Sequence, residues 1–360
     1  MRIVRLLILC AALLLSSCAA SRSDRGAAYD YTGNAAAIEQ SKAKLLSYVE
    51  RDTTVASHGF MIEFFAEDGG LKPETARGFG LLYQICLMAD SVATADEAWA
   101  WAQAADERIK AFNRTRNRTA TTGEQTIEEL EQMLSPFNEH CNAVRGEVAA
   151  LRNTLLQYKV LSAYRRLIEE CDDAQLQSLY YREFRAWSEM KDISCGLYYL
   201  YHSPVAYARG LAGSGYWVYC SSFLMRTKRM RIELLSAEKA IMGGTQVELT
   251  LEDDHRIVSL AEFGATLNFF KTMTEESFRQ MVRRLYYDGE EEPDEDIGKE
   301  NSEAIAKCGC CYESALFEWL DMREQIALRL PKHAHEPYRE ITRRLFMHLY
   351  TSLYDIKELN

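Results

Sequence analysis

The chain has 360 residues, 48% of them hydrophobic, and a formal net charge of −11. Nineteen glycines and six prolines are few for this length, which favours helices over a β architecture with many turns. The negative charge argues against nucleic acid and anionic lipid as partners. Acidity is compatible with a basic protein partner, although it also serves solubility.

The N-terminus, residues 1–17, has the features of a signal peptide. Arg2 and Arg5 come before a short apolar run, which is too short to cross a bilayer. The next residues, Leu15-Ser16-Ser17-Cys18, fit the lipobox that lipoprotein signal peptidase recognises, with Cys18 as the acylated residue. The alternative is an ordinary secretory signal with an incidental cysteine. The lipobox predicts a protein anchored to a membrane through lipid on Cys18.

Residues 18–34 are small, polar and aperiodic after the cysteine, which predicts a tether between the lipid and the folded part. Ala19, in place of an aspartate after the cysteine, favours the outer membrane within the cell envelope. Cleavage would remove Arg2 and Arg5 and leave a mature chain with a formal charge of −13.

Apolar residues then recur every three or four positions, which predicts an all-α multi-helix bundle. Thr94 with Glu97 and Thr126 with Glu129 each fit a capping box at a helix start. The expected helices cover residues 73–90, 94–113, 126–170, 174–200, 218–242, 252–287, 302–329 and 337–357.

Several segments between these helices carry turn or loop signals. Ser135-Pro136 fits an N-cap followed by a first-turn proline, and Gly243-Gly244 fits a helix stop. Gln246 to Leu251 is expected to be a short extended link. The acidic run from Gly289 to Glu300 is expected to be a solvated loop, since it lacks the ligand spacing of a calcium site.

Two tryptophans carry the same charge pattern, which suggests two related helical subdomains. Trp187 is followed by Lys191 and Asp192, and Trp319 is followed by Arg323 and Glu324. A cation four residues on lies one helical turn along the same face, where it can stack on the indole. The alternative is two ordinary amphipathic helices. The expected division is an N-terminal helical region at 35–150, a helical domain at 151–243 and a C-terminal region with a degenerate copy at 244–360.

Eight cysteines remain after cleavage before Cys18 and its lipidation. An even number in an oxidising compartment suggests disulfides, although the sequence does not fix their pairing and buried free cysteines are also common. They are Cys86, Cys141, Cys171, Cys195, Cys220, Cys308, Cys310 and Cys311.

The run Cys308-Gly309-Cys310-Cys311, with His333 and His335 downstream, could hold zinc or copper. In an oxidising compartment its thiols are better suited to pairing with other cysteines, such as Cys86 or Cys141. We therefore expect no metal and no cofactor.

A family resemblance rests on residues 151–235. The residues that carry it are Phe184-Arg185-Ala186-Trp187, Lys191-Asp192, Cys195, Gly213-Ser214-Gly215, Cys220, Arg229, Arg231, Leu234 and Leu235. In this order they resemble the LprI-like lysozyme-inhibitor domain of bacterial lipoproteins. Phe184 replaces a glutamine and Lys191 an arginine, and a Leu-Asn-x-x-Tyr element is degraded.

The resemblance implies a Cys195–Cys220 disulfide between two antiparallel helices. The motif residues themselves are best explained as scaffold: Arg185, Trp187, Lys191 and Asp192, with Trp319, Arg323 and Glu324 in the second copy. That copy has Ala327 where the cysteine would stand.

No catalytic motif is present, so no catalytic residue is predicted. His335-Glu336 is followed by Pro337 rather than by a zinc-protease pattern, and phosphate-loop, nucleophile-elbow and dinucleotide motifs are missing. The expected function is that of a lipid-anchored envelope binding protein. The resemblance implies a lysozyme-type muramidase as its target. An envelope scaffold or adaptor without inhibitory activity is the alternative, and an enzyme with an unrecognised site is the third.

Overall fold

A computed structural model describes residues 72–89, 92, 94–134, 142–202, 214–245, 260–286 and 295–354. Their secondary structure is 89% helical without strands, which confirms the all-α prediction. The signal peptide, Cys18, the tether, Ser135-Pro136 and the expected link from Gln246 to Leu251 lie outside these residues. Within them, no helix is both long and apolar enough to cross a membrane.

The chain divides into two compact units between Ala163 and Tyr164, inside helix α8. The expected boundary near Gly243 falls inside the second unit, because helices on both sides of Gly243 share one core there. The first unit holds α5 (Pro73–Ala89), α6 (Ala95–Thr115), α7 (Gly123–Leu134) and the first part of α8 (Asn142–Glu169).

The first unit is built around Trp101 of α6. Its indole donates a hydrogen bond to the carbonyl oxygen of Ile85 at 3.0 Å, and its ring meets that of Tyr158 edge-on. The hydroxyl of Tyr158 donates to Asp106. These contacts join α5, α6 and α8 in one core.

The helix starts in this unit bear out one expected cap and correct the other. Thr94 and Glu97 form the predicted capping box. Thr126 is not a cap: it is buried inside α7, where its hydroxyl accepts a hydrogen bond from Asn113 at 2.9 Å. The cap of α7 is Thr122, which exchanges hydrogen bonds with Gln125.

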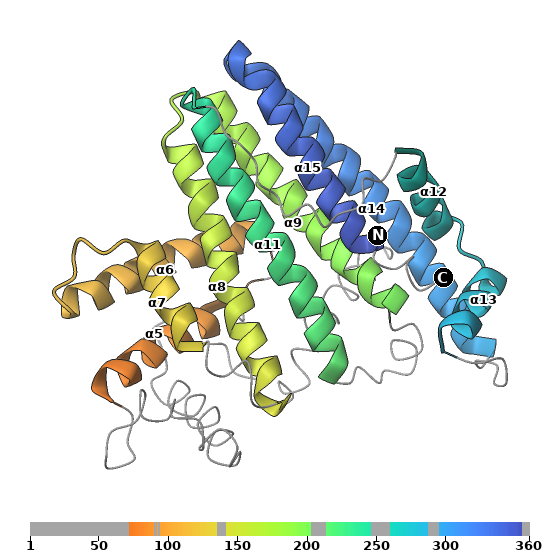
Figure 1. The fold of residues 1–360 in the computed structure, drawn as a ribbon, viewed down its shortest axis with the longest axis horizontal. Helices are drawn as coiled ribbons and strands as arrows, with labels where there is room; N and C mark the ends of the chain where they lie inside the picture. The colour runs from red at the N-terminus through yellow and green to blue at the C-terminus, as the bar shows by residue number, and fades with distance from the viewer. Residues whose placement is uncertain are drawn as a thin grey trace. The chain divides into compact units, whose positions relative to one another are not determined.

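The second unit holds the end of α8 and the remaining helices (Figure 1). The pairs α9 with α14 and α11 with α15 pack along their lengths, and α12 and α13 pack on α14. These helices are α9 (Ala174–His202), α11 (Ser214–Met242), α12 (Leu260–Lys271), α13 (Glu275–Tyr286), α14 (Glu295–Arg329) and α15 (His335–Tyr354), with the short 3-10 turn η2 (Lys332–Ala334) before α15.

The predicted single helix over 252–287 is wrong. The chain breaks between α12 and α13 because Thr274 and Ser277 exchange backbone and hydroxyl hydrogen bonds, which starts a new helix. The predicted helix over 126–170 is likewise two helices, α7 and α8.

The acidic run is also partly helical. Helix α14 begins at Glu295, seven residues before the expected start, and its first turn includes Asp296. Acidic side chains are favourable there, because the amino end of a helix is partially positive. The predicted stop at Gly243-Gly244 is confirmed, since α11 ends at Met242 and Gly244 has a positive φ of 76°.

Candidate functional site: a buried ionic core

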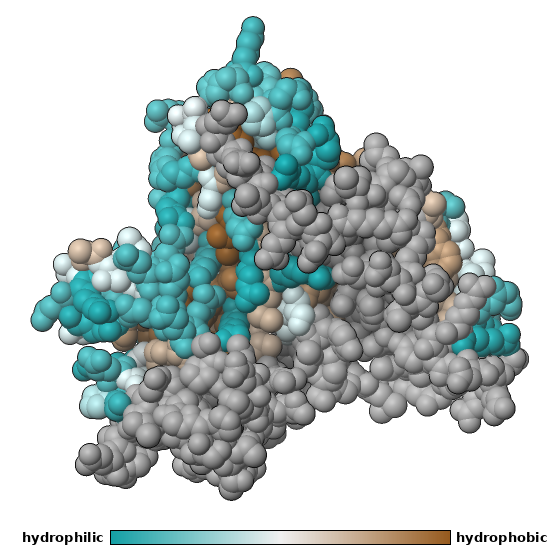
Figure 2. All heavy atoms as spheres, in the orientation of Figure 1, coloured by the Kyte–Doolittle hydropathy of each residue, from teal (hydrophilic) through white to brown (hydrophobic). Residues whose placement is uncertain are grey.

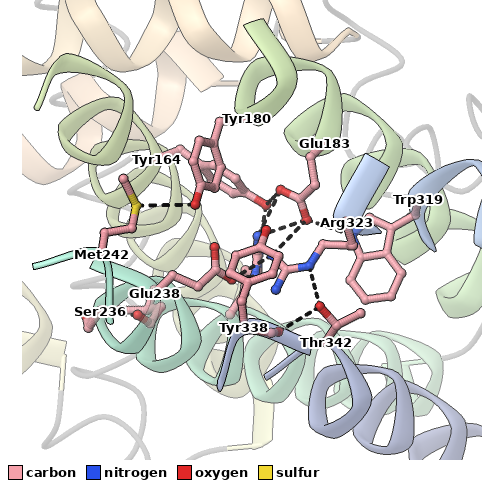
Figure 3. A network of polar contacts seen from close by, with 12 residues as sticks. Tyr164, Tyr180, Glu183, Ser236, Glu238, Met242, Trp319, Arg323, Tyr338 and Thr342 are labelled. Atoms are coloured by element: carbon pink, nitrogen blue, oxygen red, sulfur yellow. Dashed lines mark hydrogen bonds and ion pairs between the residues drawn. The ribbon is translucent and has the colours of Figure 1, made fainter. Parts of the chain in front are cut away.

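Four charged side chains meet in the centre of the second unit. They are Glu183 of α9, Arg231 and Glu238 of α11, and Arg323 of α14, each at most 1% exposed. Figure 3 shows Glu183, Glu238 and Arg323 pointing toward one another between the helices. Such burial is rare unless charges are paired.

Glu183 is the acceptor for three helices. Its carboxylate lies 2.9 Å from Nη2 of Arg231 at both oxygens. The hydroxyl of Tyr164 in α8 donates to Oε2 at 2.7 Å, and the indole nitrogen of Trp319 in α14 donates to Oε1 at 2.7 Å. One carboxylate therefore ties α8, α11 and α14 to α9.

Glu238 joins the two arginines. Its Oε1 accepts from Nη1 of Arg231 at 2.8 Å and from Nη1 of Arg323 at 2.7 Å. Nε of Arg323 donates to the hydroxyl of Thr342 in α15 at 2.9 Å, and the guanidinium lies 4.0 Å from the centre of the Tyr338 ring. The ionic core thus reaches the last helix.

The charge states follow from these contacts. Burial alone would lower the pKa of Arg231, but Glu183, Tyr164 and Glu238 outweigh it, so this pKa lies well above its ordinary value. The pKa of Arg323 is raised in the same way, with Glu238 as the largest opposing contribution. Burial raises the pKa of Tyr164 well above its ordinary range. The core therefore holds two arginine cations against two glutamates, with a neutral phenol beside them.

Three atoms of this core make no hydrogen bond with the residues that the structure describes: Oε2 of Glu238, Nη2 of Arg323 and the hydroxyl of Tyr338. Buried atoms of this kind usually bind internal water. The core side chains are too deeply buried to meet a substrate, so the arrangement is suited to fixing helix packing rather than to catalysis.

The tryptophan motifs take part in the same interior. Lys191 lies 5.9 Å from the Trp187 ring centre, and Arg323 lies 5.7 Å from that of Trp319. Both cations therefore lie one turn along, over the indole. Both tryptophans are fully buried.

The acidic residues of the two tryptophan motifs, Asp192 and Glu324, have partners in different parts of the structure. Asp192 pairs with Lys191 at 2.5 Å at the edge of the core. Glu324 lies on the surface and pairs with Arg339 of α15 at 2.6 Å, while its neighbour Arg323 turns inward. Arg185 is exposed on α9. The structure thus brings Trp319 and Arg323 into the ionic core and leaves Arg185 and Glu324 outside it.

Cys195 and Cys220 lie side by side as buried free cysteines, and the disulfide that the resemblance implies stays a prediction. The hydrogen bond to Cys220, together with burial, raises the pKa of the Cys195 thiol well above its ordinary value. Lys228 is buried beside this pair, and burial followed by the charge of Lys191 lowers its pKa well below the ordinary range.

The cysteines of the run Cys308–Cys311 lie on α14 and differ in exposure. Cys310 is exposed, and Cys308 and Cys311 are half-buried. Across the described ranges, no three His, Cys, Asp or Glu side chains are grouped as metal ligands. Gly309 has a packing role: a Cβ there would lie 3.0 Å from Cβ of Phe270 and 3.1 Å from the backbone nitrogen of Lys271, so α12 approaches α14 closely at this point.

Glu183 and Glu238, the two carboxylates of the core, were not predicted from the sequence. One signal was present: Arg231 and Glu238 are seven residues apart, two turns along one helix face, among buried leucines at 234 and 235. No protein-family model, characterised protein or solved structure matches this chain.

Proposed function

We propose that the protein is a lipid-anchored binding protein of the cell envelope that inhibits a lysozyme-type muramidase by covering its substrate cleft. The observation that carries the proposal is that the buried charges are net positive, so the negative charge of the chain lies outside them. The buried charged residues of the described part are four cations and two carboxylates, a formal +2 against −11 for the whole chain, which leaves −13 on all other residues. They are Lys191, Lys228, Arg231, Arg323, Glu183 and Glu238.

Cleavage of the signal peptide would sharpen this imbalance. Loss of Arg2 and Arg5 makes the charge outside the buried set −15. On the face seen in Figure 2, the coloured surface is mostly hydrophilic and apolar residues show mainly in seams between helices. The negative charge outside the buried set is what suits a basic partner.

The mechanism is occlusion. An acidic surface is drawn to the basic rim of the muramidase cleft, and the bound protein keeps the glycan out. Electrostatic complementarity speeds the encounter, and the attraction weakens with salt because exposed charges are screened. Lipid on Cys18 would hold the inhibitor beside the cell wall that it protects.

A binding role rather than catalysis is also supported by the place of the motif residues. Trp187, Trp319 and Arg323 are in the interior, where they hold helices together. A scaffold of this kind presents its outer faces to partners.

The test is a cell-wall turbidity assay with a basic lysozyme. The mature chain with Cys18 replaced by serine, and therefore without lipid, is added at low and at physiological salt. Stoichiometric inhibition that weakens with salt is expected. Undiminished lysis at a large molar excess of the protein would contradict inhibition, and capture of a different envelope partner would then favour the adaptor function.

A further inference from the structure

Helix α14 has one buried face and one exposed face. The buried face carries Trp319, Arg323 and Ile326 into the core. The opposite face is exposed from residue 303 to residue 328, at positions 303, 310, 314, 317, 321, 324 and 328, which recur every three, four or seven residues. This regular pattern marks one continuous surface of the helix.

Two large apolar side chains stand on that surface. Phe317 is 62% exposed and Leu328 is 61% exposed, and with Phe269 they are the large hydrophobic residues exposed in the described part of the chain. Eleven residues are close to three helical turns, so Phe317 and Leu328 share a face, about 16 Å apart. Single exposed apolar residues need no explanation, and two that share one helix face form the apolar part of a candidate interaction surface.

The unpaired charge near these two residues is negative. Between residues 308 and 329 the cations are Arg323, which is buried, and Arg329, which pairs with Asp173 at 3.5 Å. Glu313 is neutralised by Lys271 and Glu324 by Arg339. Among the described residues, Glu318 and Asp321 have no cationic partner, and Asp321 only accepts from Gln325 at 2.6 Å. The apolar pair is therefore flanked by uncompensated negative charge.

We propose that the surface formed by Phe317, Glu318, Asp321 and Leu328, the α14 face, is where a basic protein docks. The proposal rests on the function proposed above and names the surface that performs it. Apolar side chains at the centre of an interface supply most of the affinity, and charges at its rim select the partner. A second copy of this chain would bring like charges together, which disfavours self-association through this face.

The experiment measures binding of the mature chain with Cys18 replaced by serine to a basic lysozyme by calorimetry at low salt. Phe317→Ser combined with Leu328→Ser is expected to weaken binding by at least about tenfold. Glu318→Gln combined with Asp321→Asn is expected to weaken it and to flatten its salt dependence.

Two control variants remove an exposed apolar side chain or two exposed acids outside the α14 face. Phe269→Ser removes the third exposed hydrophobic residue, and Asp172→Asn with Glu233→Gln removes two exposed acids of the same unit. Both controls should bind like the unaltered chain. Circular dichroism spectra and thermal midpoints of all variants are compared, and serine at such exposed positions should leave both unchanged.

Each outcome decides one of the two proposals. If the two α14 variants lose binding and the two controls keep it, both the α14 face and the proposed function are supported. Equal binding by all variants overturns the α14 face and leaves inhibition standing. Binding through the α14 face without inhibition of lysis supports the face and overturns occlusion. Failure of the unaltered chain to bind overturns both, and a dimer that dissociates on Phe317→Ser with Leu328→Ser in sedimentation overturns the basic partner.

Discussion

Both carboxylate oxygens of Glu183 lie 2.9 Å from one nitrogen of Arg231, and neither side chain is exposed. Burial removes water from both charges, and their attraction offsets that cost only while both are present. Loss of Glu183 leaves Arg231 with Glu238 alone, which also pairs with Arg323, so two buried cations would then share one carboxylate. The stability of the second unit should therefore depend on this pair.

Replacement Glu183→Gln tests that dependence. It removes the charge that faces Arg231 and should lower the free energy of unfolding by about 3–5 kcal/mol. Urea denaturation followed by circular dichroism gives the value. The control is Glu170→Gln, which breaks an ion pair with Lys239 whose side chains are 53% and 50% exposed. That change should cost at most about 1 kcal/mol, and similar losses for the two variants would contradict the prediction.

The two buried thiols should form a disulfide on oxidation. A Cys195–Cys220 bond would close a loop of about 25 residues and stabilise the chain by about 3 kcal/mol. The raised pKa of Cys195 keeps its thiol protonated, so oxidation should be slow in the folded protein and faster during refolding. Peptide mapping without reduction identifies the bond. The control is Cys195→Ser with Cys220→Ser, and equal stability of reduced and oxidised chains would rule out the stabilising bond.

Lys228→Met should show a pH-dependent gain in stability. The pKa of Lys228 is lowered in the folded chain, so folding disfavours its charged form. The resulting cost is present at low pH and disappears as pH rises toward about 10.4, the ordinary lysine pKa that the unfolded chain retains. The variant should therefore be more stable than the unaltered chain near neutral pH, with a difference that shrinks toward pH ~10.

Urea denaturation at several pH values gives this difference. Lys239→Met, on the same helix but with a side chain 50% exposed, is the matched control and should show little pH dependence. A constant gain for Lys228→Met across the pH range would show that the buried charge is not the cause.

Gly309→Ala should loosen α12 from α14. The added methyl would meet Phe270 and the backbone of Lys271 at 3.0–3.1 Å, and a backbone neighbour cannot move alone. We expect a loss of about 1–3 kcal/mol in the free energy of unfolding. Gly264→Ala is the control, because a Cβ at that exposed position of α12 has no neighbour within 4 Å. It should stabilise the helix by up to about 1 kcal/mol, and a loss at both glycines would contradict the close contact.

The sequence predicted the fold class and several helix boundaries because these depend on local signals. The Thr94–Glu97 box and the Gly243-Gly244 stop are examples, since each acts through residues three or four positions apart. The break at Thr274 was missed because the Thr–Ser exchange lacks the acid of the usual box, while the apolar pattern runs on across it.

The ionic core was predicted only in part. The tryptophans and their cations stood out through the four-residue spacing, which one helix contains within itself. Glu183 has its partners on other helices, and Trp319 lies 136 positions away from it in the chain. Pairing at that distance leaves no periodic trace in a single sequence, which is why the acceptors of the core were missed.

That separation also sets an order of events during synthesis. Glu183 and Arg231 leave the ribosome well before Trp319 and Arg323 exist, so the early part of the chain carries its charges in water. Only when α14 is in place can Trp319 and Arg323 replace water as partners of Glu183 and Glu238. Addition of the C-terminal helices is thus the step that encloses the ionic core.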